Sequence, residues 1–312
     1  MAVAGGLQAG PGRTTRACDH RSVSRIEVTE FTDPGCPWAY SAAPALAVLR
    51  WRYREQLDWR LVTIGLTEDA ERYVERGYTP TRMTLGNIYY RRFGMPFLAE
   101  PRSRVAGTGR ACRAVIATRR LAPEHERDVL RALQLGWFTT TLVLDRDEDI
   151  ATALGYVEGL DVDAVVAAID DPATLESYER DKQETRTAEG SPTHFQGKAR
   201  QTDGPVRFSA PSLVFVCDGR RLEAGGFQPV EAYDVLIANL DPTLERHDPP
   251  DQAIEALRQF PSGLVTQEVA AIMAQNNVAP DRDAAESSLI ELCGEGAARR
   301  VALGDDALWK IA

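Results

Sequence analysis

No stretch of this chain constrains its fold more than residues 31–40, which read FTDPGCPWAY. A β-favouring run, 26–31, leads into it, and Asp33-Pro34-Gly35 has the composition of a turn. Pro37 suits the first position of a helix, where its missing N–H costs nothing. Apolar residues then recur at helical spacing as far as position 57, and residues 57–64 alternate well enough for a second strand. The sequence therefore predicts a cysteine, Cys36, at the junction of a strand and a helix.

The position of Cys36 favours a reactive thiol. At the start of a helix, unsatisfied backbone N–H groups and the positive end of the dipole stabilise an anion. The thiolate is such an anion and is the nucleophilic form of cysteine. The alternative is an inert core residue, because free cysteine is among the most buried residue types. Ala39 stands where a Cys-x-x-Cys pair would carry its second cysteine, which excludes a disulfide within the motif.

The segment resembles the active-site motif of the thioredoxin superfamily, in its disulfide-oxidoreductase A (DsbA-like) branch, which carries Cys-Pro-x-Cys after a strand. Pro44 resembles the proline that kinks the active-site helix of thioredoxins. Far downstream, Ser209-Ala210-Pro211-Ser212 leads into the apolar run 213–217, a predicted buried strand. Members of the family carry a cis-proline just before this strand, facing the cysteine, and Pro211 would be that residue. A hairpin over 217–224 and a helix near 229–239 complete the expected order.

The resemblance also implies roles for residues around the sulfur. Pro37, Trp38, Ala210 and Pro211 would bind substrate, with Trp38 as a flat apolar surface and the Ala210 backbone paired with a bound thiol. The kappa-class glutathione transferases and the 2-hydroxychromene-2-carboxylate isomerases share this fold, and they use a serine at the position of Cys36.

Three kinds of chemistry remain open to a single cysteine. It can form mixed disulfides that an external small thiol releases. It can position a thiol cofactor or add reversibly to an electrophile. It can also act as a redox sensor that is oxidised to a sulfenic acid or capped by a small thiol.

Our leading hypothesis for function is a monothiol DsbA-like oxidoreductase or isomerase that acts through the Cys36 thiolate. Its cofactor would be a low-molecular-weight thiol, glutathione- or mycothiol-like. One alternative is a kappa-transferase-like or isomerase-like enzyme acting on a small electrophile. The other is a non-catalytic redox-sensing or protein-interaction module. The expected partners are a small-molecule thiol or electrophile.

The fold class that these features predict is α/β: a thioredoxin-like fold with a large helical insertion, plus a small C-terminal winged-helix-like domain. We expect a disordered tail over 1–24, the DsbA-like domain over 25–245 with its insertion at about 66–200, and the C-terminal module over 251–312. Helical patterns dominate the insertion, for example over 111–120, 124–138 and 162–169. Asp171-Pro172 is expected to break the helical pattern and Ser191-Pro192 to open a loop.

The insertion carries unusual charge. Residues 71–131 hold 13 Lys and Arg against six Asp and Glu in a chain of net charge −10. This surplus is either a solvated surface or a field that favours the thiolate and an anionic substrate. The candidates for such a field are Arg91, Arg92, Arg110 and Arg113.

Cysteines elsewhere in the chain suggest neither a disulfide framework nor a metal site. Cys112 lies in the insertion and could resolve a mixed disulfide at Cys36, although a packed helical cysteine is the alternative. Cys217 falls in the buried strand, and Cys18 falls in the tail. The four histidines have no metal-ligand spacing, so no metal is predicted.

The C-terminal segment reads as three helices followed by a hairpin. Thr266 is expected to N-cap the second helix, and Asp283 and Glu286 to form a capping box at the third. The would-be recognition helix, 283–293, contains no basic residue, and residues 251–312 hold ten acidic against five basic residues. Because Lys and Arg contacts to phosphate dominate nucleic-acid affinity, we expect no nucleic acid as a partner. We expect the C-terminal module to bind a protein or to form a homodimer.

The remaining expectations concern location. No window approaches the roughly 18 apolar residues of a membrane helix, and residues 1–24 lack the apolar core of a signal peptide. We therefore expect no membrane partner and a cytoplasmic protein, in a compartment where disulfides are rare.

Overall fold

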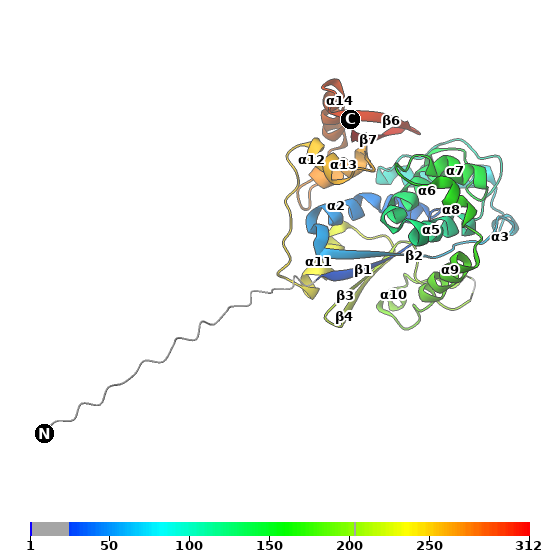
Figure 1. Ribbon diagram of the computed structural model, residues 1–312, viewed down its shortest axis with the longest axis horizontal. Helices are drawn as coiled ribbons and strands as arrows, with labels where there is room; N and C mark the ends of the chain where they lie inside the picture. The colour runs from blue at the N-terminus through cyan, green and yellow to red at the C-terminus, as the bar shows by residue number, and fades with distance from the viewer. Residues whose placement is uncertain (2–24, 203) are drawn as a thin grey trace.

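A four-stranded mixed sheet forms the centre of the computed structural model, which describes residues 1, 25–202 and 204–312 (Figure 1). Its strands are β1 (Ile26–Thr32), β2 (Leu57–Thr63), β3 (Ser212–Cys217) and β4 (Arg220–Gly225), in the order β2-β1-β3-β4. β1 runs parallel to β2 and antiparallel to β3, and β3 and β4 form a hairpin. The predicted α/β sheet is therefore confirmed. Apart from Met1, the predicted tail and Cys18 lie outside the described residues.

Two helices, α2 (Ala43–Tyr53) and α11 (Val230–Leu240), pack on one face of the sheet. The short helix α1 (Pro37–Ser41) precedes α2, and Ala42 interrupts the helix between them. Pro44 lies in the first turn of α2, where a proline is tolerated. Although Leu57 has helical spacing, it lies outside the helix and belongs to the second strand predicted over 57–64. Arg54, with a positive φ, ends α2, a 3₁₀ turn (Arg54–Gln56) follows, and Leu57 opens β2.

The segment between β2 and β3 is helical, as the sequence predicts. Its helices are α3 (Glu71–Glu75), α4 (Pro80–Tyr90), α5 (Gly109–Leu121), α6 (Glu126–Thr139), α7 (Asp147–Leu154), α8 (Val162–Ala167), α9 (Pro172–Thr185) and α10 (Pro192–Phe195), with 3₁₀ turns at Arg91–Phe93 and Pro123–His125. The predicted break at Asp171-Pro172 separates α8 from α9, with Asp171 as the N-cap of α9. The loop predicted at Ser191-Pro192 is wrong: Pro192 starts the short helix α10, because proline fits the first turn and the Ser191 side chain caps the helix.

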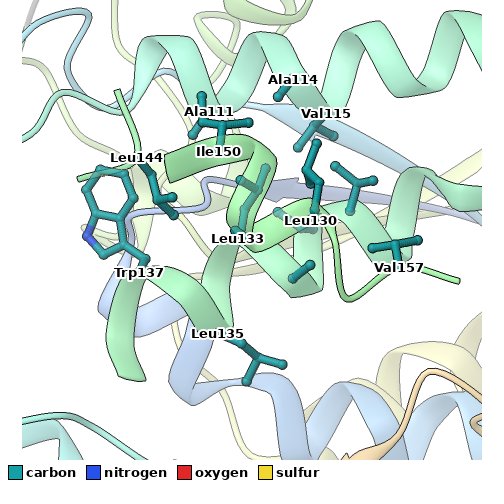
Figure 2. Packing of buried hydrophobic residues seen from close by; sticks show 14 of the residues in the cluster. Ala111, Ala114, Val115, Leu130, Leu133, Leu135, Trp137, Leu144, Ile150 and Val157 are labelled. Carbon is teal, nitrogen blue, oxygen red and sulfur yellow. The ribbon is translucent and has the colours of Figure 1, made fainter. Parts of the chain in front are cut away.

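Most residues of one hydrophobic core come from the insertion (Figure 2), and residues from outside it complete the cluster, among them Tyr40, Leu61 and Leu308. Val115 of α5, Leu133 of α6 and Ile150 of α7 are fully buried in this core. Trp137 lies on the next turn of α6. Its ring is at the same end of this core as Leu144 (Figure 2). Because the apolar faces of these helices pack against one another, the insertion is a compact, well-packed group of helices.

The C-terminal module stacks beyond α2, on the side away from the sheet (Figure 1). Its elements are α12 (Ala253–Gln259), β5 (Leu264–Val265), α13 (Thr266–Met273), α14 (Arg282–Gly294), β6 (Ala298–Leu303) and β7 (Asp306–Ile311). Its sheet has the order β5-β7-β6. The order of elements is the predicted one, and the winged-helix assignment stays a prediction. Ala47, Val48 and Trp51 of α2 share its hydrophobic core.

Both predicted helix caps of this module are wrong. Thr266 is the first residue of α13, and its hydroxyl donates to Asp306 at 2.7 Å instead of capping. The N-cap of α14 is Asp281, which accepts the Ala284 N–H at 2.9 Å, while Asp283 follows in the first turn. Tertiary partners and a cap two residues earlier therefore replace the local pattern.

Among the described residues, no helix combines the length and apolar character that crossing a membrane requires.

Candidate functional site

Cys36 lies between β1 and α1, as the sequence predicts. Its backbone N–H donates to Asp33 O at 3.1 Å, which closes the turn, and Pro37 takes the first helical position. The Ala210–Pro211 peptide bond is cis. The Cys36 thiol donates to the Ala210 carbonyl at 3.3 Å across a separation of 174 positions. The fold therefore brings the cysteine motif and the proline motif together.

An open groove of about 650 Å³ lies over the sulfur. Cys36, Pro37, Trp38 and Ala210 all line it, whereas the buried Pro211 does not. The other aromatic residues along its walls are Tyr78, Tyr90 and Phe227. The groove is large enough for a small organic ligand.

Burial dominates the ionisation of Cys36. The side chain is 5% exposed, and desolvation raises the pKa of Cys36 to about 12. The backbone N–H of Ala39 acts in the opposite direction, as do that of Trp38 and the charge of Arg207, while the Asp33 carboxylate adds to the increase. The predicted lowering of the pKa is therefore wrong for this structure, because desolvation outweighs the helix start. Near neutral pH, Cys36 is a protonated thiol.

The carboxylate of Asp33 ties together the segments around Cys36. It accepts the N–H groups of Gly35 at 2.9 Å and Leu66 at 2.8 Å, and the Thr108 hydroxyl at 3.1 Å. Its side chain is fully buried, and this burial raises the pKa of Asp33 against the effect of those hydrogen bonds. Asp33 thus connects the β1–α1 turn to the segment after β2 and to the start of α5.

Cys112 does not line the groove. It is fully buried in α5, and its thiol donates to Asp33 at 3.4 Å. Burial, reinforced by the charge of Asp33, raises the pKa of Cys112 well above its usual value. The structure therefore favours the packed-cysteine alternative in this conformation, and a resolving role for Cys112 stays a prediction. Cys217 is buried in β3, as predicted.

Trp38 is packed on several sides by aromatic rings. The centroid of its ring lies 5.1 Å from that of Tyr90, 5.5 Å from that of Phe93 and 5.6 Å from that of Phe227. Tyr89 of α4 lies at 6.3 Å. Such contacts at the start of α1 hold Trp38 in place along the groove wall.

Three basic residues that were not predicted as site residues line the groove. They are Lys198, Arg200 and Arg207. Arg200 and Arg207 form an isolated antiparallel bridge, with N–H to O distances of 2.9 and 2.8 Å in the two directions. This bridge places the two residues side by side ahead of Pro211. Their signal in the sequence is three cations within ten residues, directly before the proline motif. No acidic residue is among the described residues that line the groove.

The four arginines that were candidates for a positive field at the site have other partners. Arg110 is paired with Asp147 and Asp170, and Arg113 with Glu68 and Asp170. Arg91 donates to the Phe97 carbonyl.

Arg92 stacks on Tyr89 with its guanidinium carbon 3.5 Å from the ring centroid. None of the four arginines lines the groove. These four arginines therefore do not supply the field proposed as one alternative, and the cations that line the groove come from residues 198–207. Over the described parts of the chain, there is also no cluster of three or more His, Cys, Asp or Glu that could hold a metal ion.

Comparison with known proteins gives a likeness in structure alone. No protein-family model matches the sequence, and no curated protein matches it. A protein from Nitrosomonas europaea described as a candidate protein disulfide isomerase superposes with a TM-score of 0.53 at 16% identity, covering 69% of this chain and 97% of its own. The cytosolic disulfide reductase DsbM from Pseudomonas aeruginosa superposes with a TM-score of 0.48 at 18% identity, covering 70% of this chain and 100% of its own. The predicted fold is confirmed: the chain has a thioredoxin-like fold with a large helical insertion.

Proposed function

We propose that the protein is a thiol-dependent enzyme that binds a small anionic thiol in the Cys36 groove and uses it on an electrophile, in a transferase or isomerase reaction. The observation that carries this proposal is the lining of the groove. Lys198, Arg200 and Arg207 offer positive charge on one side, and Cys36 is the single sulfur on the other. A thiol that carries carboxylates, such as glutathione, has the matching charges.

Cys36 acts in this proposal as a hydrogen-bond donor. With a pKa of about 12 it keeps its proton near neutral pH, and its S–H already donates to the Ala210 carbonyl at 3.3 Å. A bound thiolate would accept the same S–H and would be stabilised in its charged form. The bound thiolate, not Cys36, then attacks the electrophilic carbon: a C–S bond forms, and the displaced electron pair leaves with a departing group or moves onto a conjugated oxygen.

The test compares two substitutions at one position. Glutathione bound to the wild-type protein is titrated by the ultraviolet absorbance of its thiolate, against protein alone as the blank. We expect its thiol pKa to fall by at least about one unit from the free value of roughly 8.5. Cys36→Ser keeps a donor and should keep most of the decrease, whereas Cys36→Ala should lose it. An equal pKa in the alanine variant and the wild type contradicts the donor role.

Thiol–disulfide exchange is a second candidate function, supported by the backbone N–H groups of Trp38 and Ala39 that oppose the effect of burial. In this reaction the Cys36 thiolate attacks a small-thiol disulfide, an S–S bond forms to Cys36, and one half of the disulfide leaves as a thiolate. A second small thiolate then releases Cys36, because Ala39 supplies no internal thiol. Cys36→Ser abolishes this reaction completely. If the wild type exchanges glutathione disulfide with a second small thiol and the serine variant does not, the result favours thiol–disulfide exchange.

A further inference from the structure

A second cavity lies between α2 and the C-terminal module. Its volume is about 320 Å³, at the lower end of the range for ligand pockets. One wall includes Pro44 and Val48 of α2. The opposite wall includes Ala271 and Val278 of the C-terminal module. The thiol site described above uses none of these four residues.

This cavity and the Cys36 groove meet at a cluster of aromatic rings. Phe227 lines both cavities. Phe93 lines the second, and Trp38 lines the groove. The ring centroids of Phe93 and Phe227 are 4.8 Å apart, and each lies within 5.6 Å of the Trp38 centroid. The two cavities therefore share Phe227 as a lining residue, with Phe93 and Trp38 packed against it.

The two cavities suit different chemical groups. The groove offers three cations. The charged residues that line the second cavity are Arg52 and Glu231, among the residues described there, and Arg52 is ion-paired with Asp234. The rest of the lining is apolar or uncharged, so an apolar group gains from transfer into it, whereas an ionic group loses hydration without a partner.

We propose that the second cavity holds the apolar group of the electrophile that reacts with the thiol bound at Cys36. The inference rests on the proposed function and extends it by naming the second substrate: a small electrophile that carries an alkyl chain or a single aromatic ring. The C-terminal module is then the part of the enzyme that selects this substrate, because it supplies the wall formed by Ala271 and Val278.

The experiment uses S-methylglutathione and S-hexylglutathione as analogues of the product, with dissociation constants measured by calorimetry on the full chain. Burial of a methylene contributes up to roughly fourfold in affinity. We expect the hexyl compound to bind at least about tenfold more tightly than the methyl compound. Val278→Glu, at a residue that is 60% exposed and thus tolerant of change, should remove most of that difference.

Two matched variants serve as controls. Ile290→Glu makes the same kind of change at a 57% exposed residue of α14 that does not line the cavity, and Leu85→Glu tests the exposed apolar face of α4. Both should keep the preference for the hexyl compound. Equal affinity for the two compounds, or loss of the preference in either control, overturns the inference while leaving the thiol site intact. If neither compound binds, the proposed function itself fails and the inference falls with it.

Discussion

Gly35 has no room for a side chain at the turn that presents Cys36. A Cβ at this position would lie 2.5 Å from the Thr108 methyl carbon and 3.0 Å from the Trp137 ring. The close approach joins the β1–α1 turn to the insertion, so glycine here is a packing requirement. The sequence indicated a turn at Gly35, but the helices that crowd it come from more than 70 positions away.

We therefore expect Gly35→Ala to destabilise the fold by about 1–3 kcal/mol, because the packed neighbours must move. Gly86 is the matched control. It lies within α4 with nothing within 4 Å of an added Cβ, so Gly86→Ala should be neutral or stabilise by up to about 1 kcal/mol. Denaturant unfolding of both variants measures the difference. Equal stabilities for the two variants would disprove the packing role of Gly35.

Asp33 affects both the stability and the ionisation of the site. An amide at this position cannot accept hydrogen bonds on both sides, so Asp33→Asn should cost about 1–3 kcal/mol of unfolding free energy. The same substitution removes a negative charge that raises the pKa of Cys36. We expect alkylation of Cys36 at pH 9 to be faster in the variant, with modified peptides identified by mass spectrometry. An unchanged rate in folded protein would show that Asp33 has no electrostatic effect on Cys36.

The ion pair between Arg131 and Glu268 links α6 of the insertion to α13 of the C-terminal module. Arg131 Nη1 lies 2.7 Å from Glu268 Oε1, and the Glu268 side chain is 2% exposed. Glu268 also accepts the Val265 N–H at 2.8 Å. Removing one partner of a buried pair leaves an uncompensated charge.

Arg131→Met should therefore cost about 3–5 kcal/mol, and the double variant Arg131→Met/Glu268→Gln should cost less than the two single changes together. The exposed pair of Arg180 and Glu176 within α9 is the control, and Arg180→Met should change stability little. A double-mutant cycle in denaturant gives the coupling. Additive effects in that cycle would mean that the pair does not hold the module in place.

Local patterns predicted the elements well where the signal and its cause lie within a few residues. The turn before Cys36, the apolar strand β3 and the hairpin after it follow from such patterns. The break at Asp171-Pro172 was predicted correctly, whereas Pro192 misled because only capping distinguishes a helix start from a loop there. The partners of Arg110 and Arg113 were not predictable, because Asp147 and Asp170 reach them only through tertiary packing.

The charge of the whole molecule opposes its proposed ligand, and the groove offsets that opposition locally. The chain carries a net charge of −10, while three cations and no acidic residue line the described groove. Field lines in such a groove raise the local concentration of anions. The three cations that line the groove lie outside the positively charged segment 71–131.

We expect the double variant Lys198→Glu/Arg200→Glu to bind glutathione at least about tenfold more weakly than the wild type, and added salt to weaken binding to the wild type. The double variant Arg258→Glu/Arg299→Glu, at exposed residues of α12 and β6 that do not line the groove, is the charge-matched control and should bind as the wild type does. Calorimetry at two salt concentrations measures both effects. Equal losses in the two variants would assign the effect to net charge and not to the groove.

The state of the Cys36 thiol separates the proposed donor role from thiol–disulfide exchange. With a pKa of about 12, the thiolate fraction rises about tenfold for each pH unit throughout the range below that value. The most direct measurement is the alkylation rate of Cys36 against pH, with the modified peptide identified by mass spectrometry. A protonated thiol predicts a rate that still climbs tenfold per unit at pH 10, without a plateau. A plateau with a midpoint at or below roughly 8.5 would mean an activated thiolate and would contradict the donor role of Cys36.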